Sequence, residues 1–141
     1  MVYSYSKEVL SMEQQLPNNI QILNIDPQPK PRMTRSDKWR KRPIIVRYYD
    51  YCNMLRELGA KLPEAGAKVT FNIPIPKSWS KKKQNEMIGK PHQQRPDLDN
   101  MLKALSDAVH DEDAHIWQIT VAKYWAITGS IVIESASITS Q

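Results

Sequence analysis

The sequence Arg95-Pro96-Asp97-Leu98-Asp99-Asn100 runs directly into Met101-Leu102-Lys103-Ala104-Leu105, so that an extended segment meets a helix. In an extended backbone, residues i and i+2 point to the same side, which would turn Asp97 and Asp99 toward one point. Two converging carboxylates suit a hard divalent cation such as Mg2+, which takes oxygen ligands and usually keeps several waters. The segment therefore predicts a metal site at the start of a helix.

The helix itself is predicted to run from Asn100 to about His110. Its apolar residues recur with helical spacing and form the expected buried stripe: Leu98, Met101, Leu102, Leu105, Ala108 and Val109. Asp99, Lys103 and Asp107 form a separate polar stripe, with Asp99 as the expected N-cap. We expect Lys103 to lie near the acid pair, where its charge can stabilise a transition state at a phosphate. The alternative is that Asp99 only caps the helix and Lys103 makes an ordinary surface pair.

A second acidic cluster, Asp111-Glu112-Asp113, follows this helix. Acids at a helix C-terminus oppose the helix dipole, which is a hint that positive charge lies nearby. A strand that begins near Asp113 could return beside the first acid pair and add a third oxygen ligand. The alternative is a solvated turn.

Composition bounds the function. The chain has 141 residues, 40% of them hydrophobic, which predicts one domain with a core of its own. Its net charge of +5 and pI of about 9.3 favour a phosphate-rich partner. Cys52 is the only cysteine, which excludes an internal disulfide and a thiolate zinc site and fits a reducing cytoplasm. No apolar run approaches 18 residues and no signal peptide is evident, so we expect a cytoplasmic protein without a membrane span.

The segment from Lys30 to Arg47 carries eight Lys and Arg residues and one acid, Asp37. Charge interleaved with proline and Trp39 predicts a loop along phosphate backbones, with Trp39 packed on a sugar or base. The candidate DNA contacts are Lys30, Arg32, Arg35, Lys38, Trp39, Arg40 and Lys41, together with Arg95. Lys81, Lys82 and Lys83 could add a second contact. The alternative is a solvated run of charge.

The other segments predict the elements of an α/β fold. Residues 20–25 and 69–75 alternate as strands, and the second has Val69, Phe71, Ile73 and Ile75 on one face. A helix is expected after Pro43, with Gly59 as its C-cap and a stripe that includes Ile45, Val46, Tyr49, Met54, Leu55 and Leu58. A short helix over 79–87 and strands around 116–124 and 131–133 follow.

This order predicts a small single α/β domain with a mixed β-sheet, two main helices and a C-terminal β-hairpin. Residues 1–18 are expected to form an N-terminal arm, and residues 19–138 the domain. Pro74 and Pro76 restrict the strand over 69–75 to an edge or to a strand end.

Taken together, these motifs resemble a known family. Arg-Pro-Asp-Leu-Asp-Asn-x-x-Lys-Ala (residues 95–104), Asp107-Ala108 and Glu112-Asp113-x-His115-Ile116 are similar to the RusA family of Holliday-junction resolvases. The segments Lys30-Pro31-Arg32-Met33-Thr34 and Asp37-Lys38-Trp39 resemble its phage-type members. The resemblance spans roughly residues 20 to 135.

The resemblance implies a homodimer of mixed α/β fold that cuts four-way DNA junctions symmetrically with Mg2+. It implies Asp97, Asp99 and Asp113 as metal-binding acids and Lys103 as the functional lysine. Two departures concern the acid pair usually written Asp-Asp, which is Glu112-Asp113 here, and the common Gln after it, which is His115. The connection after Asp107 also looks short for the family. Asp113 is therefore the first choice for the third ligand, and Asp111 is its substitute.

We expect a Mg2+-dependent, structure-selective endodeoxyribonuclease, with Mn2+ as a substitute metal and no small-molecule cofactor. If it is phage-encoded, it would act in the cytoplasm of a bacterial host. Two alternatives stay open: a non-catalytic phage DNA-binding or regulatory protein, in which the acids are caps and turn residues, and a less selective metal nuclease.

Overall fold

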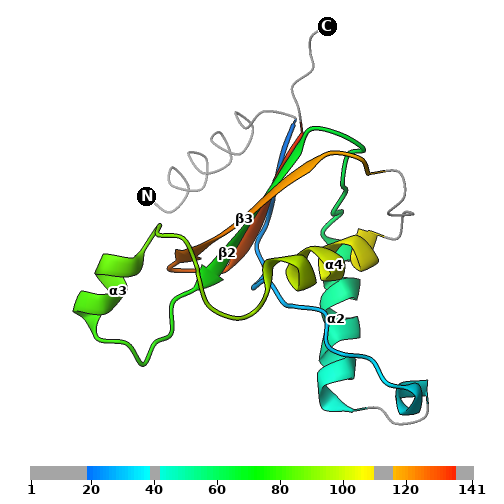
Figure 1. Ribbon diagram of the computed structural model, residues 1–141, viewed down its shortest axis with the longest axis horizontal. Helices are drawn as coiled ribbons and strands as arrows, with labels where there is room; N and C mark the ends of the chain where they lie inside the picture. Colours follow the sequence, from blue (N-terminus) through cyan, green and yellow to red (C-terminus); the bar gives the residue numbers. More distant parts are fainter. Residues whose placement is uncertain (1–18, 39–41, 110–115, 136–141) are drawn as a thin grey trace, which may run out of the picture.

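The computed structural model describes residues 19–38, 42–109 and 116–135. Its elements are, in chain order, β1 (Ile20–Leu23), the 3-10 helix η1 (Arg35–Lys38), α2 (Pro43–Glu57), β2 (Ala67–Pro74), α3 (Lys81–Met87), α4 (Leu98–Val109), β3 (Ile119–Ala126) and β4 (Ser130–Glu134). α2 and α4 pack against each other on one side of the sheet, while α3 projects beyond its end (Figure 1). The predicted α/β class with two main helices is confirmed.

The sheet is mixed, with the strand order β1-β4-β2-β3. β2 runs parallel to β3 and antiparallel to β4, and β4 pairs antiparallel with β1. A parallel pair needs a long crossover, and the segment that contains α3 and α4 supplies it. This crossover delivers the start of α4, with the predicted acid pair, to the side of β3.

The prediction of a C-terminal hairpin is confirmed in its two consecutive strands and short turn, and is corrected in their pairing. β3 and β4 are joined by residues 127–129, yet β2 lies between them in the sheet. The pairing of β2 with β4 stops at Asn72 opposite Ser130, and β2 ends at Pro74, so the connection can cross the end of β2. Gly129 lies against Asp26, too close for a Cβ atom. Pro74 thus marks the end of a central strand, one of the two positions expected for it.

Helix α2 has the predicted extent but a different buried face. It begins at Pro43, and Gly59 follows its end with a φ of 78°, a conformation that favours glycine. Its buried residues are Ile45, Tyr48, Tyr51, Cys52 and Leu55, whereas Val46, Tyr49, Met54 and Leu58 are exposed. Apolar residues occur on every side of this helix, so hydrophobic period alone does not select the face.

The core lies between the two helices and the sheet. Its fully buried side chains include Leu55 from α2, Met101 and Leu105 from α4, and Phe71 and Ile131 from the sheet. The stripe predicted for α4 is largely confirmed, because Ala108 is also buried and Leu98 and Val109 pack against the core. Burying an amphipathic face in this way is what fixes α4 against the sheet.

Residues 89–92 pair with the outer edge of β3. The Gly89 N–H donates to the Trp125 carbonyl, and the Trp125 N–H donates to the Lys90 carbonyl, at 2.8 and 2.9 Å. His92 is buried against Trp125, with ring centroids 4.1 Å apart, and burial lowers the pKa of its imidazole. These contacts place residues 93–97 beside β3, just before α4.

None of the helices in the described ranges is long and apolar enough to cross a bilayer. The predicted N-terminal arm, residues 1–18, lies outside the described residues, and the division of the chain into arm and domain stays a prediction.

Candidate functional site at the start of helix α4

The two acids of the predicted metal site lie at the first turn of α4. The Asp97 carbonyl accepts the Met101 N–H at 3.2 Å, which makes Asp97 rather than Asp99 the N-cap residue. Asp99 lies within the helix. The extended-backbone argument for convergence of the two side chains therefore does not hold, because helical residues two apart do not face each other. The two acids are close in sequence at one helix end, and both are exposed.

Lys103 lies one turn beyond Asp99, on the surface as predicted. Its Nζ atom is 3.8 Å from Asp99 Oδ2, and the two side chains are 61% and 71% exposed. A pair this long and this exposed is a weak interaction. Lys103 and Asp99 are thus both accessible to a phosphate or a metal ion, and their contact also fits the alternative of a simple surface pair.

The third metal ligand is not placed. Asp113, its first candidate, and Asp111, the substitute, lie in residues 110–115, outside the described part. Over the described ranges, no three His, Cys, Asp or Glu side chains are grouped so that they could hold a metal ion. The three-carboxylate site stays a prediction.

Lys123 is a residue of this region that sequence reasoning missed. From β3, its Nζ atom donates to the carbonyl oxygens of Gln94 and Pro96 at 2.5 and 2.6 Å, directly before Asp97. In the sequence, Lys123 can be recognised as a lysine on the apolar face of a strand. The other residues of that face are Ile119 and Val121, which pack against the core, and Trp125, which is buried.

A second polar network joins the basic segment to α4. The Lys30 N–H donates to the Asn100 carbonyl at 3.1 Å, and its Nζ atom lies 2.9 Å from Asp107 Oδ2. The buried Tyr48 donates its hydroxyl to the same Asp107 oxygen at 2.5 Å. Partial burial raises the pKa of Asp107, but the bonds from Lys30 and Tyr48 outweigh it and leave the pKa below its usual range. Asp107 therefore ties three segments together, and its carboxylate is engaged by Lys30 and Tyr48.

This network gives a stability prediction. Tyr48→Phe should lower the free energy of unfolding by about 1 kcal/mol, because one hydrogen bond to a partly exposed carboxylate is lost. The folded pKa of Asp107 is depressed, so this stabilisation is present above the unfolded pKa, about 4, and is lost as pH falls through the folded value. Urea unfolding at pH 7 and pH 3 measures the effect, with Tyr49→Phe, an exposed neighbour, as the control. An equal loss in both variants would contradict the assignment.

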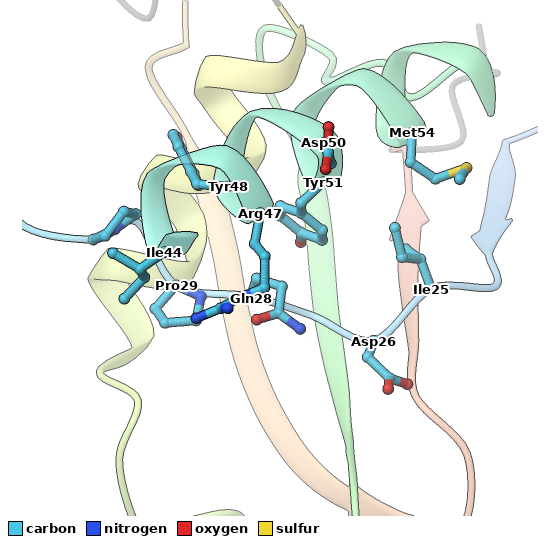
Figure 2. A pocket seen from close by; sticks show the side chains of 11 residues that line it. Ile25, Asp26, Gln28, Pro29, Ile44, Arg47, Tyr48, Asp50, Tyr51 and Met54 are labelled. Atoms are coloured by element: carbon cyan, nitrogen blue, oxygen red, sulfur yellow. The ribbon is translucent and has the colours of Figure 1, made fainter. Parts of the chain in front are cut away.

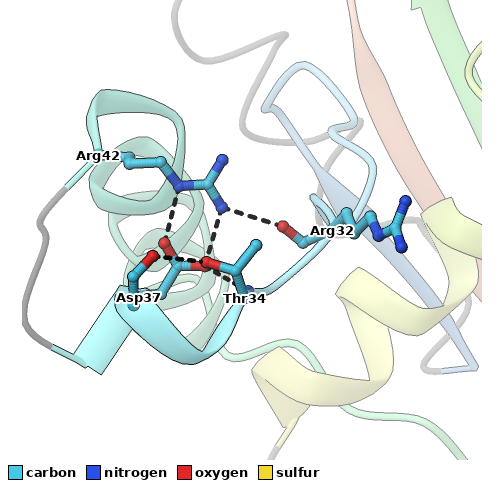
Figure 3. Close-up of polar contacts among 5 residues, drawn as sticks. Arg32, Thr34, Asp37 and Arg42 are labelled. Carbon is cyan, nitrogen blue, oxygen red and sulfur yellow. Dashed lines mark hydrogen bonds and ion pairs between the residues drawn. The ribbon is translucent and has the colours of Figure 1, made fainter.

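Asp37, the single acid of the basic segment, accepts hydrogen bonds from residues on both sides of it in the sequence. Arg42 binds Asp37 through two nitrogens, Nε to Oδ1 at 2.7 Å and Nη2 to Oδ2 at 2.8 Å, and also donates to the Arg32 carbonyl at 3.0 Å (Figure 3). The Thr34 N–H donates to Asp37 Oδ2 at 2.7 Å. The hydrogen bonds from Arg42, followed by that from Thr34, hold the pKa of Asp37 far below its usual range. Arg42 and Asp37 thus shape the loop and are not free for a ligand.

The predicted DNA contacts have different outcomes. Arg32, Arg35 and Arg95 are exposed, as a phosphate contact requires, whereas Lys30 is paired with Asp107. The side chain of Lys38 and residues Trp39, Arg40 and Lys41 lie outside what the structure describes. Lys81, Lys82 and Lys83 are exposed on α3, and Lys83 Nζ lies 4.1 Å from the centroid of the Trp79 ring.

A pocket of about 540 Å3 opens between α2 and residues 25–31 (Figure 2). Its walls are mostly apolar and include Ile25, Pro29, Ile44 and Met54, with Arg47 and Asp50 from α2. None of Asp97, Asp99 and Lys103 lines it. The pocket is therefore separate from Asp97 and Asp99, which are exposed at the start of α4.

Comparison with known families decides among the classes of function. The family model of endodeoxyribonuclease RusA matches residues 24–135. The chain belongs to the RusA endodeoxyribonuclease family. The match covers every element from η1 to β4, including the start of α4 with Asp97, Asp99 and Lys103. No curated protein and no solved structure matches the chain.

Membership in the RusA family identifies the chain as a nuclease of the type that acts on DNA internally. The exposed acids at the start of α4 are the candidates for the chemistry of this nuclease.

Proposed function

We propose that this RusA-family protein resolves four-way DNA junctions by Mg2+-dependent hydrolysis of phosphodiester bonds. The observation that supports the proposal is that Asp97, Asp99 and Lys103 are all exposed within the first turns of α4, in the segment that matches the family. The net charge of +5 favours a polyanionic substrate.

The residues fit a hard cation. Asp97 and Asp99 supply oxygen donors, both are exposed, and the side chain of Asp97 has no hydrogen-bond partner among the described residues. Mg2+ is commonly bound by one or two carboxylates together with waters and substrate phosphate, so this pair provides a sufficient protein contribution. Mn2+, which prefers the same oxygen ligands, is expected to substitute. We assign Asp97, Asp99 and Asp113 as the ligands, with Asp111 as the substitute for Asp113.

In the proposed reaction, Asp97 and Asp99 would hold the cation through their carboxylate oxygens. When bound, Mg2+ supplies polarisation of the phosphate and a lowered pKa of water. Lys103 presents its ammonium group to the negative charge that grows on the phosphate oxygens in the transition state. The exposure of Lys103 and its loose contact with Asp99 leave it free to turn toward the DNA.

DNA binding is assigned to the basic segment together with Arg95. Arg32, Arg35 and Arg95 are exposed. The Asp37–Arg42 pair fixes the conformation of the loop that carries Arg32 and Arg35. We include Lys38, Trp39, Arg40 and Lys41 from the sequence. Lys30 has a different role, because its bond to Asp107 joins this loop to α4 and so sets the distance between the DNA contacts and the acids.

A symmetric junction requires two cuts, and we propose a homodimer that presents one acid site to each of two opposite arms. We also place the reaction in a reducing cytoplasm, and the free, buried thiol of Cys52 supports this placement. Both statements rest on the family and the composition.

The salt dependence of binding tests the basic segment. Replacing Arg35, Lys38, Arg40 and Lys41 with Gln should flatten the slope of log affinity against log salt by roughly 0.9 for each lost phosphate contact. Trp39→Ala should weaken binding with little change of slope, because packing releases no counterions. The measurement is junction binding with Ca2+ in place of Mg2+, and Lys61→Gln, an exposed lysine in the loop after α2, is the control. An unchanged slope in the fourfold variant would remove this segment from the interface, with Lys81, Lys82 and Lys83 next to be tested.

A direct test of the proposed activity is nicking. The protein should cut a labelled four-way junction in Mg2+ and leave it intact in EDTA, while it binds the junction in both. Metal-independent binding without any nicking would instead indicate the non-catalytic DNA-binding protein.

A further inference from the structure

We propose that Lys123 is a positioning residue of the cleavage site, which acts by fixing the backbone that presents Asp97. This inference rests on the proposed function of Asp97 as a metal ligand. It concerns a residue on β3 that is 20 or more residues away from the acids and the lysine of α4 in the sequence.

Lys123 forms hydrogen bonds to the segment that precedes α4. The Lys123 Nζ atom donates to the Gln94 carbonyl at 2.5 Å and to the Pro96 carbonyl at 2.6 Å. The Lys123 backbone carbonyl also accepts the His92 N–H at 3.0 Å. Main chain and side chain of Lys123 thus hold residues 92–96 at both ends, and Asp97 is the next residue along the chain.

Lys123 lies on a face of β3 whose other side chains are apolar. Lys123 pairs with Phe71 across the parallel strands, and Phe71 is fully buried. Side chains two apart on a strand share a face, so Lys123 lies between Val121, which packs against the core, and the buried Trp125. Lys123 is half-buried, and the two carbonyls satisfy two of the three donors of its ammonium group. A lysine at this position on the strand is explained by the two carbonyls that it bonds.

The backbone that Lys123 bonds leads directly into Asp97, the proposed metal ligand. The side chain of Asp97 has no hydrogen-bond partner among the described residues, and Asp97 is exposed. Its position therefore depends on the backbone, which is fixed on one side by α4, through the bond from Met101, and on the other by Lys123. A misplacement of about 1 Å in a reacting constellation can cost about 100-fold in rate. Removing the Lys123 donors should therefore loosen the metal site and leave the DNA contacts of the basic segment, such as Arg32 and Arg35, in place. Of the proposed DNA contacts, Arg95 alone lies in the stretch that Lys123 holds.

The test compares three variants. Lys123→Met removes the donors and keeps most of the stem, Lys123→Arg keeps donors for both carbonyls, and Lys68→Met is the control. Lys68 is an exposed lysine on the neighbouring strand β2, and no hydrogen bond of its side chain is present among the described residues. Mn2+ binding to the protein alone is measured by electron paramagnetic resonance. Single-turnover cleavage of a four-way junction is measured against Mg2+ concentration, and junction affinity is measured in Ca2+.

We expect Lys123→Met to weaken Mn2+ binding several-fold, to raise the Mg2+ concentration for half-maximal cleavage, and to lower the maximal rate ten- to a hundredfold. Junction affinity in Ca2+ should stay within about twofold of wild type. Lys123→Arg should recover most of the metal affinity, and Lys68→Met should match wild type. If Lys123→Met does not fold by circular dichroism, Lys123→Gln, which keeps one amide donor group, takes its place in the same comparison.

Unchanged Mn2+ affinity and an unchanged Mg2+ profile in a folded Lys123 variant would overturn the inference, because the lysine would then only stabilise the loop. Loss of junction affinity with an unchanged Mg2+ profile would overturn it as well, and would make Lys123 either a DNA contact or a support for Arg95. These outcomes differ from a failure of the proposed function, in which the wild-type protein itself does not cut the junction in Mg2+.

Discussion

Asp97→Asn and Asp99→Asn should each abolish junction cleavage while junction binding is retained. Each substitution removes a charged metal ligand and keeps the size of the side chain. Loss of the ligand should cost several kcal/mol of transition-state stabilisation, at least about 100-fold in rate. The fold should survive, since both residues are exposed and Asn is as good an N-cap as Asp at position 97.

The measurement is single-turnover cleavage of a labelled four-way junction in Mg2+, with binding measured in Ca2+. Asp50→Asn is a matched control, because Asp50 is also an exposed aspartate, on α2 and away from the acids of α4. A rate within a few-fold of wild type for either Asp97→Asn or Asp99→Asn would remove that residue from the metal site. A loss of binding that accounts for the loss of rate would make the acids structural.

Lys103→Ala should lower the cleavage rate far more than it lowers junction affinity. The loss of one donor to developing charge typically costs about 100-fold or more in rate. Lys103 is 61% exposed, and its contact with Asp99 is long, so its removal should leave the stability of the fold nearly unchanged. Single-turnover rates and Ca2+ binding isotherms separate the two effects.

The outcome for Lys103 also distinguishes among three roles. If only affinity falls, Lys103 is a phosphate anchor and the mechanistic assignment is wrong. If neither quantity changes, Lys103 and Asp99 form the ordinary surface pair that their 3.8 Å contact also allows. Lys61→Ala, at an exposed lysine in the loop after α2, is the matched comparison for the loss of a single exposed charge.

The fold was predictable wherever one hydrophobic pattern dominated. The stripe of α4 and the alternation of β2 are both clear in the sequence, and both face the core as expected. The face of α2 was not predictable in this way, because exposed Tyr49 and Met54 are as apolar as several of the residues that are buried. What selects the buried face is tertiary: Tyr48 finds a partner for its hydroxyl in Asp107 of α4, which no local pattern reveals.

Strand pairing was the other limit of the sequence. A three-residue turn favours a hairpin, yet β3 pairs with β2, and β4 pairs with β2 and β1. The crossover through α3 and α4 brings β3 beside β2 in parallel, and this long-range arrangement depends on the burial of α4.

At the site, the sequence could name the acids and Lys103 but could not describe what supports them. The extended-backbone argument was wrong because α4 begins at Leu98 and so includes Asp99. Lys123 and Lys30 reach the start of α4 and Asp107 from strand and loop segments distant in sequence, and such contacts follow only from the fold. The bidentate pair of Asp37 and Arg42 was likewise hidden within a run of basic charge.

The most decisive measurement is cleavage of a synthetic four-way junction and of a linear duplex of matched sequence, each with Mg2+ and with EDTA. We predict paired, symmetric cuts in opposite arms of the junction in Mg2+, little cutting of the duplex, and no cutting of either in EDTA, with Asp97→Asn inactive on both. Equal cutting of junction and duplex would leave a metal nuclease without structural selectivity. Cutting that persists in EDTA, or in the Asp97→Asn variant, would contradict the assignment of the acids of α4 as the metal site.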